Sequence, residues 1–90
     1  MNSVFENNLY KFTGFKLSAL FENNEEYDAI ELYSRFIIFT LVGIKQEGEQ
    51  KEYKCLFNLM SDVAIERFGL LWWCQILQKG VNRFNIFYNN

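Results

Sequence analysis

The segment AIELYSRFIIFTLVGIK, residues 29–45, decides the fold class that this sequence predicts. Side chains of a β-strand alternate between two faces, so the two parities of the numbering report on the two faces separately. Both parities are apolar here: Ile30, Leu32, Phe36, Ile38, Val42 and Ile44 on one, and Tyr33, Ile37, Phe39 and Leu41 on the other. A strand that is apolar on both faces is typical of a central strand covered on both sides. The early part, Glu25–Tyr33, also allows a helix, because Tyr27, Ile30 and Tyr33 are three residues apart.

Two further alternating segments flank this one. Glu47-Gly48-Glu49 is a hairpin signal, and Lys51–Leu59 follows it with Tyr53, Cys55, Phe57 and Leu59 on one parity. Upstream, Leu9–Phe21 alternates with a slip in phase at Gly14, which a β-bulge would explain. A helix over residues 15–22 is the alternative for the second half of that segment.

One main helix is expected over Asp62–Lys79. Ser61 is placed to cap its N-terminus and Gly80 to end it. Val81–Tyr88 then alternates as a last strand. The order β-β-β-α-β predicts an α+β fold in a single domain of residues 1–90: a four-stranded, mostly antiparallel sheet with one main helix packed on one face.

Composition weighs against most enzymes. The 90 residues include no histidine and no proline, and half of them are hydrophobic. Without histidine, the usual general base and nucleophile activator is missing. No phosphate-binding glycine loop or serine elbow occurs, so we predict neither catalysis nor a cofactor. Cys55 and Cys74 are too few for a zinc site and are expected to be buried thiols, with a disulfide as the alternative.

Charge and hydropathy limit the classes of partner that the sequence predicts. Nine Lys and Arg residues against eleven Asp and Glu give a net charge of −2, which argues against direct nucleic-acid binding. The longest apolar runs, near Phe36–Val42 and Phe68–Cys74, are far shorter than the ~20 residues of a membrane span. The N-terminus has no secretory pattern, so the cytoplasm is the expected location.

Acidic residues cluster in one stretch. No Lys or Arg occurs between Leu17 and Ser34, and this stretch contains Glu22, Glu25, Glu26, Asp28 and Glu31. A solvated loop explains the cluster without any function. As a functional hypothesis, these carboxylates form a docking patch for a basic protein, with Tyr27 or Tyr33 as a buried anchor, because clustered charge steers a partner of opposite sign.

The expected helix presents a second apolar face. Leu70, Trp73 and Leu77 lie opposite the side that would cover the sheet. Another part of the chain could fold over this face. Alternatively it forms an interface, including one with a second copy, since tryptophan is enriched at binding hot spots.

These observations favour a non-catalytic protein-binding module. The most specific version of this hypothesis is a small acidic immunity protein that blocks a basic bacterial toxin, such as a nuclease. The cleft of a nuclease attracts phosphate groups, so it would also accept carboxylates. The alternative is a homo-oligomeric structural or assembly protein joined through Leu70, Trp73 and Leu77. A third hypothesis is a phage-encoded inhibitor of a host defence nuclease.

Overall fold

The fold is all-α, and the predicted α+β sheet is wrong. The computed structural model describes residues 2–22, 26–46 and 51–88, and for residues 26 and 27 the backbone alone. Within these ranges, no residue lies in a strand. The described residues form four α-helices and one short 3₁₀-helix: α1 (Ser3–Thr13), η1 (Leu17–Phe21), α2 (Glu26–Gln46), α3 (Lys51–Phe68) and α4 (Leu70–Tyr88).

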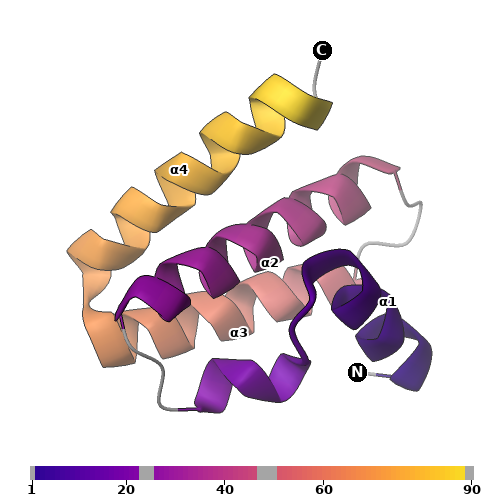
Figure 1. Ribbon diagram of the computed structural model, residues 1–90, viewed down its shortest axis with the longest axis horizontal. Coiled ribbons are helices and arrows are strands. Elements are labelled where there is room, and N and C mark those ends of the chain that lie inside the picture. Colours follow the sequence, from indigo (N-terminus) through magenta and orange to yellow (C-terminus); the bar gives the residue numbers. More distant parts are fainter. Residues whose placement is uncertain (1, 23–25, 47–50, 89–90) are drawn as a thin grey trace.

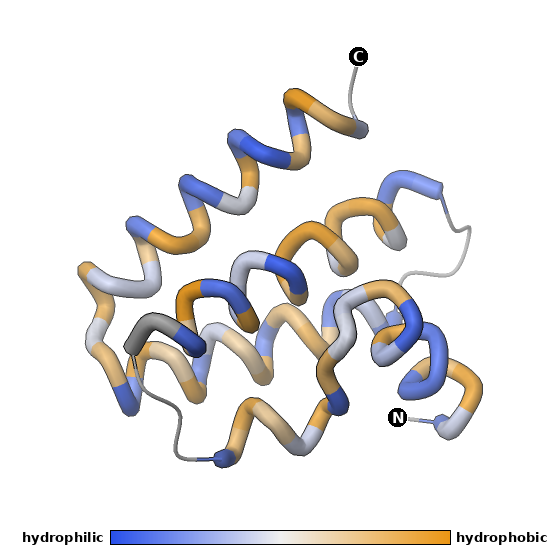
Figure 2. Tube along the Cα trace, viewed as in Figure 1, coloured by the Kyte–Doolittle hydropathy of each residue, from blue (hydrophilic) through white to orange (hydrophobic). Residues whose placement is uncertain are grey.

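Helix α2 is the centre of the molecule. It contacts α1, α3 and α4, and Figure 1 shows α3 and α4 along it with α1 across its C-terminal half. Five consecutive residues, Phe36 to Thr40, are buried, so this middle part of the helix is covered on all sides. The hydrophobic colour along the second half of α2 in Figure 2 reflects this position.

This burial explains why the predicted central strand over Ala29–Lys45 is wrong. An element that is apolar on every side has no polar face, and alternation of parity cannot separate a buried strand from a buried helix. Length separates them, because strands usually have 3–10 residues and this segment has 17. The helical alternative for Glu25–Tyr33 agrees with α2 from its start at Glu26.

A glycine corner divides the predicted helix Asp62–Lys79. Gly69 has φ +98°, a conformation that favours glycine, and it separates α3 from α4. Its N–H donates to the carbonyl of Ile65 at 3.0 Å, and its own carbonyl accepts from the N–H of Trp73 at 3.1 Å. Ser61 lies inside α3 and Gly80 inside α4, so neither is the predicted helix end. The predicted strand Val81–Tyr88 is the last part of α4.

Helix α3 replaces the second strand of the predicted hairpin. Its fully buried residues are Leu56, Met60 and Ala64, which follow the four-residue spacing of a helix rather than the alternation read over Lys51–Leu59. The predicted hairpin turn, Glu47–Glu49, lies outside the described residues.

The N-terminal segment is helical as well, and the predicted strand Leu9–Phe21 is wrong. The Asn2 side chain caps α1 by accepting from the N–H of Phe5 at 2.7 Å. Gly14 ends α1 with φ +82°, where a β-bulge was expected. The helical alternative for residues 15–22 agrees closely with η1.

Two arginine side chains hydrogen-bond this N-terminal segment to the other helices. Arg35 donates to the carbonyl of Thr13 at 3.0 Å, and Arg67 donates to the carbonyl of Leu20 at 2.9 Å. Carbonyls at the ends of helices lack partners within the helix, and a cationic donor satisfies them well. Within the described ranges, none of the helices is long and apolar enough to cross a bilayer.

Candidate binding surfaces

Of the acidic residues singled out in the sequence, Glu22 directly follows η1, and Glu26, Asp28 and Glu31 lie in the first turns of α2. Glu22 and Asp28 are exposed, whereas Glu31 is partly buried and accepts from Arg35 Nε at 2.7 Å. Glu25 lies outside the described residues, as do the side chains of Glu26 and Tyr27. Acidic residues stabilise the positive N-terminal end of a helix, so the start of α2 gives this cluster a structural role.

Tyr33 is placed in the core, where it cannot anchor a partner. Its side chain is fully buried, and its ring packs edge-on against Trp72 at 5.3 Å and Phe68 at 6.1 Å between centroids. Burial raises the pKa of its hydroxyl, an effect partly offset by the positive charge of Arg67. The hydroxyl is buried without a hydrogen-bond partner.

The predicted interface residues do not share an exposed face. Trp73 is only 4% exposed, and its ring contacts Tyr33 and Phe57 at 6.3 and 5.7 Å. Leu77 packs against the core, and Leu70 alone of the three is well exposed, at 61%. The chain therefore covers its own tryptophan with α2 and α3.

Both cysteines are exposed and free, contrary to the expected burial and to the disulfide alternative. They lie on outward faces of α3 and α4. Among the residues that the structure describes, no three His, Cys, Asp or Glu side chains gather in a way that could hold a metal ion.

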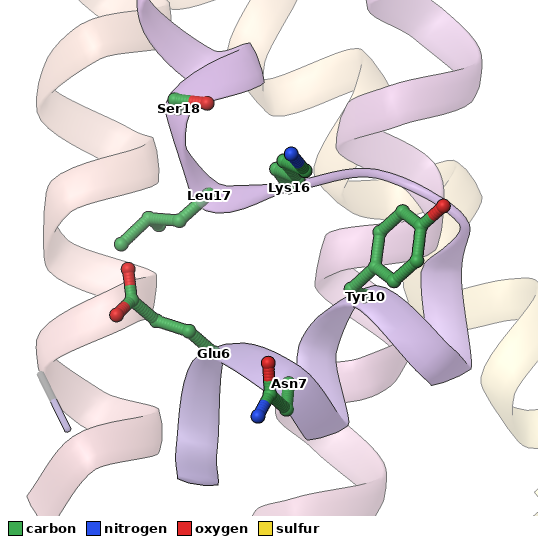
Figure 3. A pocket seen from close by; sticks show the side chains of 6 residues that line it. All are labelled: Glu6, Asn7, Tyr10, Lys16, Leu17 and Ser18. Atoms are coloured by element: carbon green, nitrogen blue, oxygen red, sulfur yellow. The ribbon is translucent and has the colours of Figure 1, made fainter. Parts of the chain in front are cut away.

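One shallow pocket separates α1 from η1. It has a volume of about 280 Å³ and is lined by Glu6, Asn7, Tyr10, Lys16, Leu17 and Ser18, whose side chains surround the opening in Figure 3. All of these side chains are exposed except Leu17, which is partly buried.

A second pocket lies where α1, α2 and α3 meet. Its volume is about 220 Å³, and we call it the aromatic pocket, lined by Asn8, Phe12, Phe39, Val42, Gly43, Gln46 and Tyr53. The Phe12 ring packs edge-on against Phe39 at 5.5 Å, and Phe39 packs against Tyr53 at the same centroid distance. Three packed aromatic rings, one from each of these helices, therefore line the pocket.

The aromatic surface continues from this pocket to the end of α4. Phe12 is 43% exposed and Tyr88 is 44% exposed, with 6.4 Å between their ring centroids. The ammonium of Lys45 donates to the carbonyl of Tyr88 at 2.8 Å and lies 5.9 Å from the Phe84 ring. These contacts join α1, α2 and α4 into one surface at this end of the molecule.

Helical spacing in the sequence could have predicted this surface, although an interpretation of the same segments as alternating strands does not show it. Phe5, Leu9 and Thr13 are buried at helical spacing, and Asn8 and Phe12 form the adjacent stripe of the same helix. Similarly, Phe39, Val42, Gly43 and Gln46 follow a helical i, i+3, i+4, i+7 pattern. A helical interpretation of both segments would have placed these residues on two common faces.

Comparisons of this chain with protein-family models, with curated proteins and with solved structures found no match.

Proposed function

We propose that this chain is a non-catalytic protein-binding domain and that the aromatic pocket is its docking site. The observation that supports this most directly is the exposure of Phe12, which lines the pocket together with Phe39 and Tyr53, and of the neighbouring Tyr88. Exposed aromatic residues that form one surface are typical of interaction sites, because leaving them in water is unfavourable.

The size of the pocket favours a protein partner over a small molecule. At about 220 Å³ it is smaller than the roughly 300–1,000 Å³ of typical small-molecule sites. An opening of this size suits one large side chain of a partner. The amide groups of Asn8 and Gln46 line the same pocket and could bond the partner's backbone.

Site-specific photo-crosslinking tests the proposal. A photoreactive amino acid at position 46, in the pocket lining, would be compared with one at position 75, on the outward face of α4. Both Gln46 and Gln75 are exposed, so the two probes start with similar access to solvent. In cells of the source organism, we expect a crosslinked species of defined mass from position 46 and none from position 75.

A matched pair of substitutions makes the result specific. Phe12→Asp should abolish the crosslinked species, whereas Phe21→Asp should preserve it, because Phe21 is 62% exposed but lies on η1, away from the pocket lining. Equal crosslinking from positions 46 and 75, or a species that survives Phe12→Asp, would contradict the proposal.

Inhibition of a basic toxin is a second candidate for the same class of function. Glu22 and Asp28 support it, because both carboxylates are exposed near the junction of η1 and α2. Glu31 contributes less, because it is paired with Arg35. If this candidate holds, Glu22→Lys with Asp28→Lys should remove a captured basic protein that Phe12→Asp leaves in place. The opposite pattern would exclude it.

The free thiols support a location of the protein in a reducing compartment. Cys55 and Cys74 are exposed and unpaired with each other. Exposed thiols persist where glutathione keeps them reduced, so we propose the cytoplasm as the location.

A further inference from the structure

We propose that this chain forms a domain-swapped dimer, in which two copies exchange α4, and that Gly69 is the hinge of the exchange. In the swapped dimer α3 and α4 of each chain become one continuous helix, and each α4 packs on the α2 helix of the other chain. This inference concerns a second copy of the chain and does not depend on the proposed binding function.

The connection between α3 and α4 is a single residue. Gly69 follows Phe68, the last residue of α3, and precedes Leu70, the first residue of α4. Its N–H donates to the carbonyl of Ile65, four residues earlier, and its carbonyl accepts from the N–H of Trp73, four residues later. Both bonds have the spacing of an α-helix, so a straight helix through this position would keep them. The chain turns here because of the left-handed φ of +98°.

Straightening the hinge adds hydrogen bonds. The first N–H groups of α4 and the last carbonyls of α3 lack partners within their own helices, as at every helix end. In a continuous helix the N–H groups of Leu70, Leu71 and Trp72 donate to carbonyls four residues earlier, which belong to α3. A short hinge between two packed elements is typical of chains that swap domains.

A straightened α4 needs the α2 helix of a second copy. A continuous helix over residues 51–88 is about 57 Å long at 1.5 Å per residue, whereas the longest dimension of the molecule is 32 Å. The α4 part would project from its own chain and expose Trp73, Ile76 and Phe84, which are buried in the structure. Exposure of these side chains is unfavourable. A second copy that opens in the same way uncovers an α2 helix that offers them the contacts they make now.

Exposed leucines at the hinge fit a new interface between the two chains. Leu71 is 72% exposed, and Leu70 is exposed as well. In a continuous helix both share a face with Cys74, because they precede it by three and four residues. The swap brings two such faces near each other, since each α4 begins where α3 of the other chain ends. Apolar side chains that lie in water in the single chain then gain a partner.

Gly69→Ala is the first test. Alanine disfavours the left-handed corner and favours a helix, so at low concentration it destabilises the single chain, whereas it stabilises the continuous helix. We expect it to lower the dimer dissociation constant at least about 100-fold, because each of two hinges contributes a factor of about 10 or more. Size-exclusion chromatography with light scattering, after refolding from urea over a range of protein concentrations, measures this constant.

Two variants are matched controls. Gly80→Ala is the same chemical change within α4, and it crowds Ile37 whether that α2 helix belongs to the same chain or to the other one. It should therefore not promote dimers. Leu70→Pro should suppress them, because proline is favoured at the first position of a helix but loses an N–H bond and clashes inside a continuous one.

A photo-crosslink distinguishes the swapped dimer from other dimers. The Tyr88 ring, at the end of α4, lies 6.4 Å from the Phe12 ring of α1. A photoreactive phenylalanine analogue at position 88 should crosslink to position 12 within one chain of the monomer. In the swapped dimer the same crosslink joins two chains and doubles the mass on a denaturing gel. The native chain, refolded at high concentration, should also give the doubled species, and Leu70→Pro should remove it.

The outcomes decide whether α4 is exchanged. A dimer of Gly69→Ala whose position-88 crosslinks join two chains supports the swap. A Gly69→Ala chain that stays monomeric, or a dimer whose crosslinks stay within each chain, would overturn it. If Gly69→Ala fails to fold, as judged by helical circular dichroism, the native chain gives the answer. Crosslinks between native chains that Leu70→Pro removes support the swap, whereas crosslinks within chains only, or crosslinks between chains that survive Leu70→Pro, would overturn it.

Discussion

Gly80 of α4 packs directly against Ile37 of α2. A Cβ added to this glycine would lie 2.6 Å from Cγ2 of Ile37, closer than two carbon atoms can approach. Both residues are buried, and this approach brings α4 against the central helix. The glycine is therefore needed for helix packing, and not as the helix stop that its position before Val81 suggested.

Gly80→Ala should destabilise the protein by about 1 kcal/mol. Overpacking a tight contact costs about 1–3 kcal/mol, while alanine in place of glycine inside a helix recovers about 1 kcal/mol. Urea unfolding of both proteins measures the difference. In an Ile37→Ala background the clash is gone, so the same substitution should be neutral or stabilising. A stabilising effect in the native background would show that the two helices are farther apart.

Gly69→Ala tests the corner between α3 and α4. The open space around Gly69 would accept a Cβ, but its φ of +98° strains any L side chain, so we expect a loss of about 1–2 kcal/mol. One continuous helix through this position would instead gain about 1 kcal/mol from alanine. The sign of the change in unfolding free energy therefore distinguishes the corner from the helix predicted over Asp62–Lys79.

Thr13 and Thr40 are two buried threonines with different roles. The Thr13 hydroxyl accepts from the N–H of Phe15 at 3.1 Å and donates to the carbonyl of Leu9 at 2.7 Å. Thr13→Val should cost about 1–3 kcal/mol because it leaves that N–H without its partner.

Thr40→Val is the matched control. The Thr40 hydroxyl donates to the carbonyl of Phe36 at 2.8 Å. That carbonyl can still accept from a backbone N–H of the helix when the hydroxyl is removed. This substitution should change stability by less than about 1 kcal/mol. Denaturation of the two variants side by side gives the comparison, and equal losses would argue against the role assigned to the Thr13 hydroxyl.

Tyr33 predicts a loss of stability in alkali. Its folded pKa lies above the ordinary value of 10.0 because burial disfavours the phenolate. Below pH 10 both the folded and unfolded states keep the proton, and stability is complete. As the pH rises above 10 the unfolded state releases its proton first, so the free energy of unfolding falls until the folded pKa is passed.

Tyr33→Phe isolates this effect. Phenylalanine cannot ionise, so the fall in unfolding free energy above pH 10 should be smaller than in the native chain. The variant should also be at least as stable near neutral pH, since the buried hydroxyl has no hydrogen-bond partner. An unchanged alkaline profile would mean that the Tyr33 hydroxyl reaches solvent.

The sequence determined that Ala29–Lys45 is the centre of the core, because its side chains are apolar on both parities. It also determined the excess of carboxylates around Glu22–Glu31 and the lack of the usual catalytic histidine. It left open whether that core segment is strand or helix, since an element covered on every side loses the polar face that reports its period. Two helical alternatives that the sequence allowed, for residues 15–22 and for Glu25–Tyr33, agree with the structure.

Tertiary packing decided the rest. Burial depends on which helix lies against which. The sequence pattern left Trp73 either covered by another part of the chain or part of an interface, and in the structure α2 and α3 cover it. The same packing brought Phe12 to Tyr88, 76 positions later in the chain, and so formed a surface that no single segment contains. Local sequence fixes the faces of each helix, but only the long-range contacts among helices decide which faces stay in water.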